Sequence, residues 1–108
     1  MISDGESIYP AELEQVISRI PGIVESAVVG ISDERWGDIP VAVVIVDRET
    51  GSGATEILAA FVGQLARLKH PRAVGFTEAL PHNAMGKVLK HELRSAIEEG
   101  SIPLTFRD

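Results

Sequence analysis

The stretch Pro40–Val46, which reads PVAVVIV, is almost continuously apolar and rich in β-branched side chains. A strand of this composition is typical of the centre of a sheet, where other parts of the chain cover both faces. We therefore expect residues 40–46 to form the central strand of the fold. Such a strand needs amphipathic elements on both sides of the sheet, and the flanking sequence supplies them.

Three segments repeat apolar residues at helical spacing, and two more are strand-like. The first helix is expected to begin at Pro10, whose missing N–H would be unpaired at that position in any case. Glu12 and Glu14 follow in its first turns, where carboxylates complement the helix dipole. In chain order we expect a hairpin (1–9), a helix (10–20), strands (23–31 and 40–46), a helix (55–68), a strand (73–77), a helix (89–97) and a loosely held tail (101–108). This order predicts an α+β fold, in which a small central sheet of about three main strands plus the N-terminal hairpin is covered by three helices.

The composition limits the possible functions. The chain has 108 residues, of which 44% are hydrophobic, as is usual for one small globular domain. It has no cysteine, so disulfides, thiolate metal sites and cysteine nucleophiles are excluded, and its three histidines lack the spacing of a helical metal site. A net charge of −6 disfavours nucleic-acid binding. No apolar run could span a bilayer and no leader precedes the first helix, so we expect a cytoplasmic location.

A second stretch, Leu80–Lys90, carries the candidate chemistry. Pro81, Asn83 and Gly86 are turn-forming residues, so the chain should leave a strand, cross a tight loop and present Lys87 just before the last helix. A lysine in this place carries a compact charge on a flexible stem, which is suited to meeting an anion. A solvated surface lysine would fit the local pattern as well.

Two further features fit either a structural or a binding role. Positive charge gathers at residues 67–72 around His70, where it would complement the end of a helix or bind a phosphate. Trp36, the only tryptophan, falls in a polar loop at residues 32–38. Its ring would either cover the core or offer a flat face to a ligand.

Four segments resemble, in order along the chain, motifs of the adenylate-forming enzymes. This superfamily includes the acyl-CoA synthetases, the luciferases and the adenylation domains of peptide synthetases. The segments are residues 3–14 (SDGESIYPAELE), a strand and its following loop at 28–30 (VVG) and 33–37 (DERWG), then 69–72 (KHPR) and 80–88 (LPHNAMGKV). Asp4 and Ser7 stand where the family usually has glycine and asparagine, and His82 and Asn83 replace its Arg-Thr pair. The resemblance covers about residues 1–94 and implies an excised C-terminal domain, beginning just after a hinge and inactive without its large N-terminal domain.

The resemblance also implies a two-step reaction. A carboxylic acid, such as a fatty acid, attacks the α-phosphate of ATP, which the large domain holds with Mg²⁺, and coenzyme A then displaces AMP from the acyl-adenylate. Lys87 is the implied catalytic residue of the first step. After rotation of the domain, Gly5 would line the pantetheine channel and Trp36 would lie near the pantetheine arm. Contacts to the nucleotide end of coenzyme A would come from Leu68, His70 and Arg72.

Two other functions remain open at this point. The chain would also fit an amino-acid or aryl-acid adenylation domain that loads a carrier protein. It would fit, thirdly, a non-catalytic α+β binding module. The basic residues at 67–72 favour coenzyme A over a carrier protein, because a carrier protein does not present the phosphates of the nucleotide.

Overall fold

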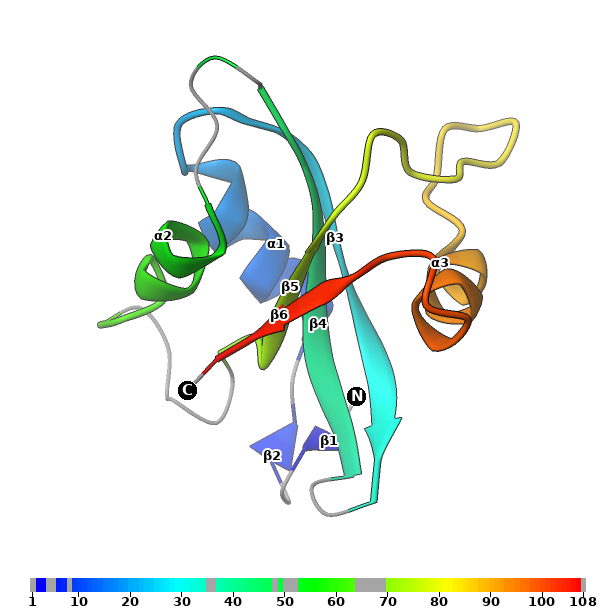
Figure 1. Ribbon diagram of the computed structural model, residues 1–108, viewed down its shortest axis with the longest axis horizontal. Coiled ribbons are helices and arrows are strands. Elements are labelled where there is room, and N and C mark those ends of the chain that lie inside the picture. The colour runs from blue at the N-terminus through cyan, green and yellow to red at the C-terminus, as the bar shows by residue number, and fades with distance from the viewer. Residues whose placement is uncertain are drawn as a thin grey trace.

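The computed structural model describes residues 2–3, 6–7, 9–34, 37–47, 49, 53–63 and 70–107. Along these residues Figure 1 shows the elements β1 (Ile2–Ser3), β2 (Glu6–Ser7), α1 (Pro10–Ser18), β3 (Ile23–Asp33), β4 (Gly37–Val46), α2 (Ala54–Ala59), β5 (Ala73–Phe76), α3 (Lys90–Glu98) and β6 (Leu104–Phe106).

Strand β4 is the centre of a mixed sheet. It pairs antiparallel with β3 along almost its whole length and with β1 at Gly37, and it pairs parallel with β5 from Val41 to Val44. Strand β6 continues the sheet beyond β5, and β2 continues it beyond β1. The path through the sheet is β2-β1-β4-β5-β6, with β3 alongside β4. The expected N-terminal hairpin is therefore confirmed by the β1–β2 pairing, while its turn residues Asp4 and Gly5 lie outside the described part of the chain.

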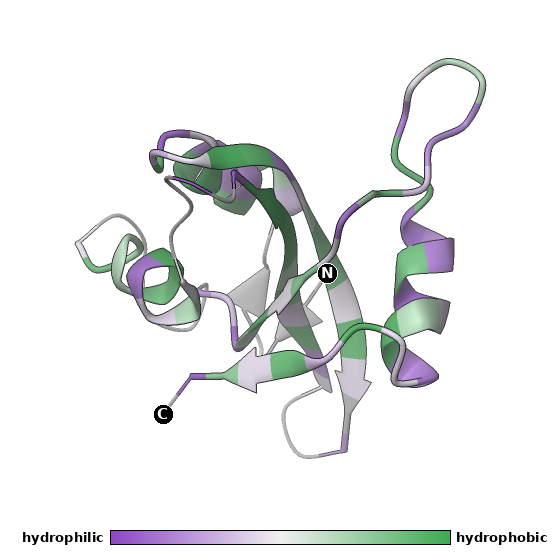
Figure 2. Ribbon diagram, turned by 45° about the horizontal axis from the view of Figure 1, so that its top comes forward, coloured by the Kyte–Doolittle hydropathy of each residue, from purple (hydrophilic) through white to green (hydrophobic). Residues whose placement is uncertain are grey.

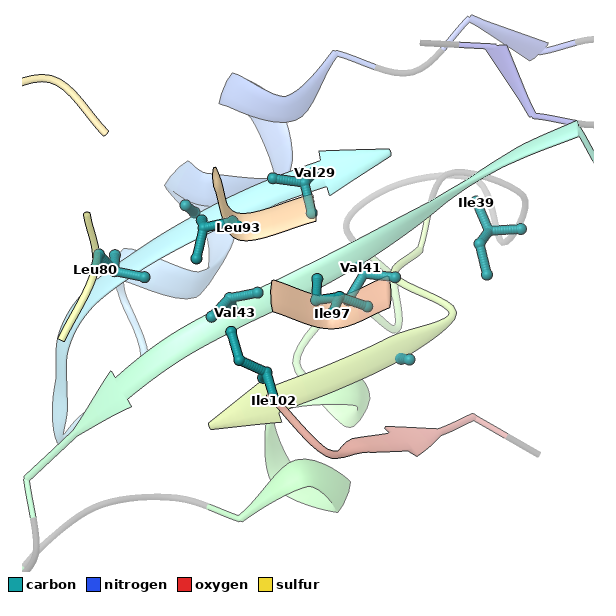
Figure 3. Packing of buried hydrophobic residues seen from close by; sticks show 10 residues of the cluster. Val29, Ile39, Val41, Val43, Leu80, Leu93, Ile97 and Ile102 are labelled. Atoms are coloured by element: carbon teal, nitrogen blue, oxygen red, sulfur yellow. The ribbon is translucent and has the colours of Figure 1, made fainter. Parts of the chain in front are cut away.

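Both faces of β4 are buried. Residues Val41–Val44 have no exposed surface, and their side chains alternate between two hydrophobic clusters. Ala42 and Val44 face one cluster, with the buried side chains of α1 and of α2 and the turn after it (Leu13, Ile17, Ile57 and Phe61). Val41 and Val43 face the other, which Figure 3 shows with Leu93 and Ile97 of α3. The sheet thus lies between α1 and α2 on one side and α3 on the other. The predicted burial is confirmed for residues 40–44, whereas Ile45 and Val46 are half-buried.

The second helix is shorter than its apolar pattern predicts. The sequence predicts a helix over residues 55–68, but α2 ends at Ala59 and the chain continues in turns to Gly63. Gly63 has a φ of 82°, a left-handed conformation that a helix cannot continue through and that glycine adopts without strain. Phe61 nevertheless keeps its place in the core, because the turn presents it on the same side as Ile57. Residues 64–69 lie outside the described part of the chain.

The C-terminal segment is not a loosely held tail. Residues 104–106 form β6, which pairs antiparallel with β5 from Gly75 to Ala73. Ile102 is 8% exposed and belongs to the cluster under α3. The expectation of a loose tail is therefore wrong over residues 102–106. One buried isoleucine and a strand of three residues form too short a pattern for a strand to be predicted from sequence.

Among the described residues, no helix combines the length and the apolar character that crossing a bilayer requires.

Replacing Ile102 should destabilise the fold if the C-terminal segment is part of the core. We expect Ile102→Ala to lower the free energy of unfolding by about 2 kcal/mol, at the low end of the range for such truncations because the side chain lies at the edge of its cluster. Phe106→Ala, which removes a 60% exposed ring from the same segment, is the control and should cost about 0.5 kcal/mol. Urea unfolding of the chain measures both, and equal losses would contradict the docking of Ile102.

Candidate functional site

Lys87 lies on a small hairpin between β5 and α3. We call residues 81–89 the lysine loop. His82 and Val88 form an antiparallel bridge, and the Leu89 N–H donates to the Pro81 carbonyl at 2.8 Å. The loop therefore satisfies much of its backbone by itself, and it projects from the body of the domain beyond α3, as the yellow segment in Figure 1 and the extended loop in Figure 2 show.

Asn83 and Gly86 explain why the lysine loop turns where it does. The Asn83 side-chain oxygen accepts hydrogen bonds from the backbone N–H groups of Met85 and Lys87, at 2.9 and 3.0 Å. The Gly86 N–H donates to the Asn83 carbonyl at 3.0 Å, and Gly86 has a φ of 84°. Asparagine commonly closes turns in this way, and glycine is the residue that adopts positive φ without strain. The two turn residues singled out in the sequence thus set the backbone at Lys87.

The Lys87 side chain is exposed and lines an open cavity of about 680 Å³. The residues that line it come from α1, β3, the lysine loop and α3, and they include Glu14, Ser26, Lys90, His91 and Arg94. Of the ion pairs formed by the described residues, none involves Lys87. The ammonium group is therefore available to an anion that approaches from outside the domain.

A histidine–carboxylate hydrogen bond and an ion pair hold the base of the lysine loop. On the first leg, His82 Nε2 lies 2.7 Å from Glu25 Oε2 of β3. On the second leg, Lys90 Nζ lies 3.0 Å from Glu14 Oε2 of α1. Each of these side chains keeps about a third of its surface exposed, and the two contacts join one leg to β3 and the start of α3 to α1.

Glu14 has a different role from the one its position in the first helix suggests. Its Oε2 accepts a hydrogen bond from the Val28 N–H at 2.8 Å, in addition to pairing with Lys90. It is thus a junction between α1, β3 and α3. Sequence analysis missed this junction and the Glu25 contact, because both join segments far apart in the chain and no local pattern marks them.

The basic segment near residue 70 lies elsewhere on the domain. His70 is 8% exposed, and its ring lies 5.7 Å from the Phe61 ring. Arg72 is partly buried, and its N–H donates to the Pro40 carbonyl at 2.8 Å, which docks the segment beside β4. His70 and Arg107 line an open cavity of about 380 Å³ between α2 and β6. Leu68, together with Arg67 and Lys69, lies outside the described residues.

Of the candidate residues that the structure describes, Lys87 lies at a different place on the domain from His70 and Arg72. Gly5 and Trp36 themselves lie outside the described residues, but Ser3 of β1 pairs with Gly37 of β4. Val41, four residues further along β4, pairs with Ala73, next to Arg72. The lysine loop leaves from the other end of β5, on the opposite side of the view in Figure 1. The structure therefore does not bring Lys87 together with His70 and Arg72.

The described residues contain no group of three or more histidine, aspartate or glutamate side chains that could hold a metal ion.

Comparison with known proteins gives consistent matches. Residues 12–87 match the model of the AMP-binding enzyme C-terminal domain. The long-chain-fatty-acid–CoA ligase FadD13 of Mycobacterium tuberculosis is 47% identical over 94 residues, which cover 87% of this chain and 18% of that ligase. A 2-succinylbenzoate–CoA ligase of Bacillus cereus is 42% identical over 99 residues, which cover 92% of this chain and 20% of that ligase.

A solved structure agrees with this match. The Mycobacterium tuberculosis fatty acyl CoA synthetase superposes with a TM-score of 0.87 at 43% identity, over 93% of this chain and 20% of the synthetase. The chain thus spans about a fifth of the length of the curated relatives it matches.

The turn built by Asn83 can be tested directly. We expect Asn83→Ala to speed hydrogen exchange at the Met85 and Lys87 amides about fivefold, because each loses a hydrogen bond that contributes about 1 kcal/mol. Asn83→Asp keeps a side-chain acceptor and should leave both amides protected. Exchange measured by NMR would contradict this account of the loop if the two variants behaved alike.

Proposed function

Because this chain belongs to the family of AMP-binding enzyme C-terminal domains, we propose that it is the small domain of an ATP-dependent, AMP-forming acid–CoA ligase. The two curated relatives described above are CoA ligases, and the domain they share with this chain is a fifth of their length. The remaining four-fifths would hold ATP, its Mg²⁺ and the acid. A cytoplasmic location is part of the same proposal.

In this proposal Lys87 acts in the first half-reaction. The carboxylate of the acid attacks the α-phosphate of ATP, forming the acyl-adenylate and releasing pyrophosphate. Two anions must meet in this step, and their repulsion is strong where water is excluded. An ammonium placed between the carboxylate and the phosphate oxygens offsets that repulsion and stabilises the transition state.

The exposed ammonium of Lys87 on a self-contained hairpin is the observation that carries the proposal. The lysine loop pairs its legs through the His82–Val88 bridge and the Leu89–Pro81 hydrogen bond. It can therefore enter a neighbouring active site while keeping those backbone hydrogen bonds. None of the ion pairs among the described residues competes for its charge.

The second half-reaction would use a different surface of the domain. Coenzyme A thiolate attacks the acyl-adenylate, forming the thioester and releasing AMP. The proposed contacts to coenzyme A come from Gly5 and Trp36 along the pantetheine arm and from Leu68, His70 and Arg72 at the nucleotide. The distance between the basic segment and the lysine loop supports an alternation, in which a hinge rotation presents first one surface and then the other. Because His70 is nearly buried, Arg72 offers more surface to a phosphate.

The matches favour coenzyme A as the acceptor of the acyl group, but they do not identify the acid. One relative is named for a long-chain fatty acid and another for 2-succinylbenzoate, although both are similarly related to this chain. The similarity therefore does not point to one acid, and a carboxylic acid is the substrate class we propose. Transfer to coenzyme A, measured beside transfer to a phosphopantetheinylated carrier protein, separates this function from that of a carrier-loading adenylation domain.

Lys87→Ala in the full-length protein should reduce adenylate formation about 100- to 1,000-fold, the usual cost of losing one group that stabilises transition-state charge. Thioester formation from supplied acyl-adenylate should stay within about twofold. Pyrophosphate release and thioester formation measure the two steps. Ala84→Ser, in the same loop, should leave both unchanged, and equal loss of both steps in Lys87→Ala would refute the role of Lys87.

Arg72→Ala should raise the KM for coenzyme A about tenfold while changing the KM for ATP little, because a lost charge-assisted hydrogen bond to a phosphate weakens binding by at least that factor. Arg19→Ala removes an exposed arginine just beyond α1 and serves as the control. Steady-state kinetics with each substrate varied give both constants. A rise in the KM for ATP alone would mean that Arg72 does not contact coenzyme A.

A further inference from the structure

Glu14 presents a fixed negative charge close to the lysine loop. Its side chain is 28% exposed, and its Oε2 is held by the Val28 N–H at 2.8 Å. A carboxylate that has lost much of its hydration attracts a nearby cation more strongly than one in open solvent. The same cavity is lined by Lys87, Lys90 and Arg94, which are three possible partners for this one carboxylate.

Lys90 is the cation that Glu14 holds. Its Nζ lies 3.0 Å from Glu14 Oε2, and its side chain is 34% exposed. Lys90 is the first residue of α3, where the helix dipole disfavours a positive charge. The helix itself therefore gives no reason for a lysine at this position, whereas the pairing with Glu14 does.

We propose that Lys90 is a positioning residue that occupies Glu14 and so keeps the Lys87 ammonium from pairing within its own domain. This inference rests on the function proposed for Lys87. An ammonium engaged by Glu14 would have to break that ion pair before it could meet the carboxylate and the nucleotide. Lys90 thus keeps the Glu14 carboxylate and the Lys87 ammonium, which line one cavity, from pairing with each other. The Lys87 ammonium can then bind an anion from outside the domain.

The inference predicts what happens when Lys90 loses its charge. In Lys90→Met, Glu14 is left without its partner and Lys87 becomes a candidate replacement. Arg94, one turn further along α3, lines the same cavity and could take the place instead. The substitution is therefore made both alone and together with Arg94→Met, with Arg94→Met alone as the reference.

The first measurement does not depend on ligase activity. Acetic anhydride reacts with the neutral form of a lysine amine, so an ion pair, which favours the ammonium form, slows the labelling. Mass spectrometry gives the labelling rate of Lys87 relative to an added lysine peptide. We expect labelling of Lys87 to slow about fivefold in Lys90→Met/Arg94→Met relative to Arg94→Met, the factor expected for one partly exposed ion pair. The difference should shrink in high salt, because screening weakens such pairs.

Charge restoration separates this role from a purely structural one. Lys90→Arg should keep wild-type labelling, because arginine also pairs with Glu14. Adding Glu14→Gln to the slow variant should restore the labelling of Lys87, since the amide can still accept the Val28 N–H but attracts no cation. In the full-length protein, adenylate formation should fall and recover in parallel with labelling. Circular dichroism confirms that each variant is folded.

Three results are decisive. Unchanged labelling of Lys87 in Lys90→Met/Arg94→Met would overturn the inference, whatever the ligase activity. Labelling that stays slow after Glu14→Gln would also overturn it, because the effect would then come from altered folding of the loop. A third result would separate the two proposals. If labelling falls and recovers as expected but adenylation survives Lys87→Ala, then Lys90 does keep Lys87 from pairing with Glu14, and the proposed function of Lys87 is wrong.

Discussion

The burial of β4 on both faces is the constraint on which the rest of the structure depends. Residues Val41–Val44 have no exposed surface, so the sheet needs helices on both sides. Helix α2 connects the parallel strands β4 and β5 and packs with α1 on one face, while α3 packs on the other. The chain must therefore pass from one side of the sheet to the other after β5. The lysine loop lies in this connection, which is why Lys87 stands away from the sheet.

The same arrangement separates the candidate surfaces. The segment at residues 70–73 is docked on the early part of β4, through the Arg72–Pro40 hydrogen bond and the pairing of Ala73 with Val41. The lysine loop is fixed at its two legs, by Glu25 and by Glu14. In the proposed function, a rotation of the domain as a unit would exchange these two anchored segments at the active site of the large domain. This geometry supports the proposal that one small domain serves two chemical steps.

The sequence predicted those features that short-range patterns encode. The apolar composition of residues 40–46 indicated a strand buried on both faces. Pro10 marked the start of a helix, and Asn83 with Gly86 marked the turn before Lys87. The apolar pattern at residues 55–68 continues past the end of α2 at Ala59, and the positive φ of Gly63 shows that no helix runs through residue 63. Strand β6 was missed because its pairing with β5 depends on a partner distant in the chain. The junction at Glu14 was missed for the same reason, since its partners belong to β3 and α3. The roles proposed for Gly5, Trp36 and Leu68, which lie outside the described residues, come from the family resemblance.

A crystal structure of the full-length protein with a non-hydrolysable acyl-adenylate analogue tests the central claim most directly. The account predicts that Lys87 Nζ lies within about 3 Å of an oxygen at the acyl–phosphate junction, the distance of a charge-assisted hydrogen bond, while Lys90 remains paired with Glu14. A Lys87 ammonium paired with Glu14, or directed away from the adenylate with the domain closed over it, would contradict the account.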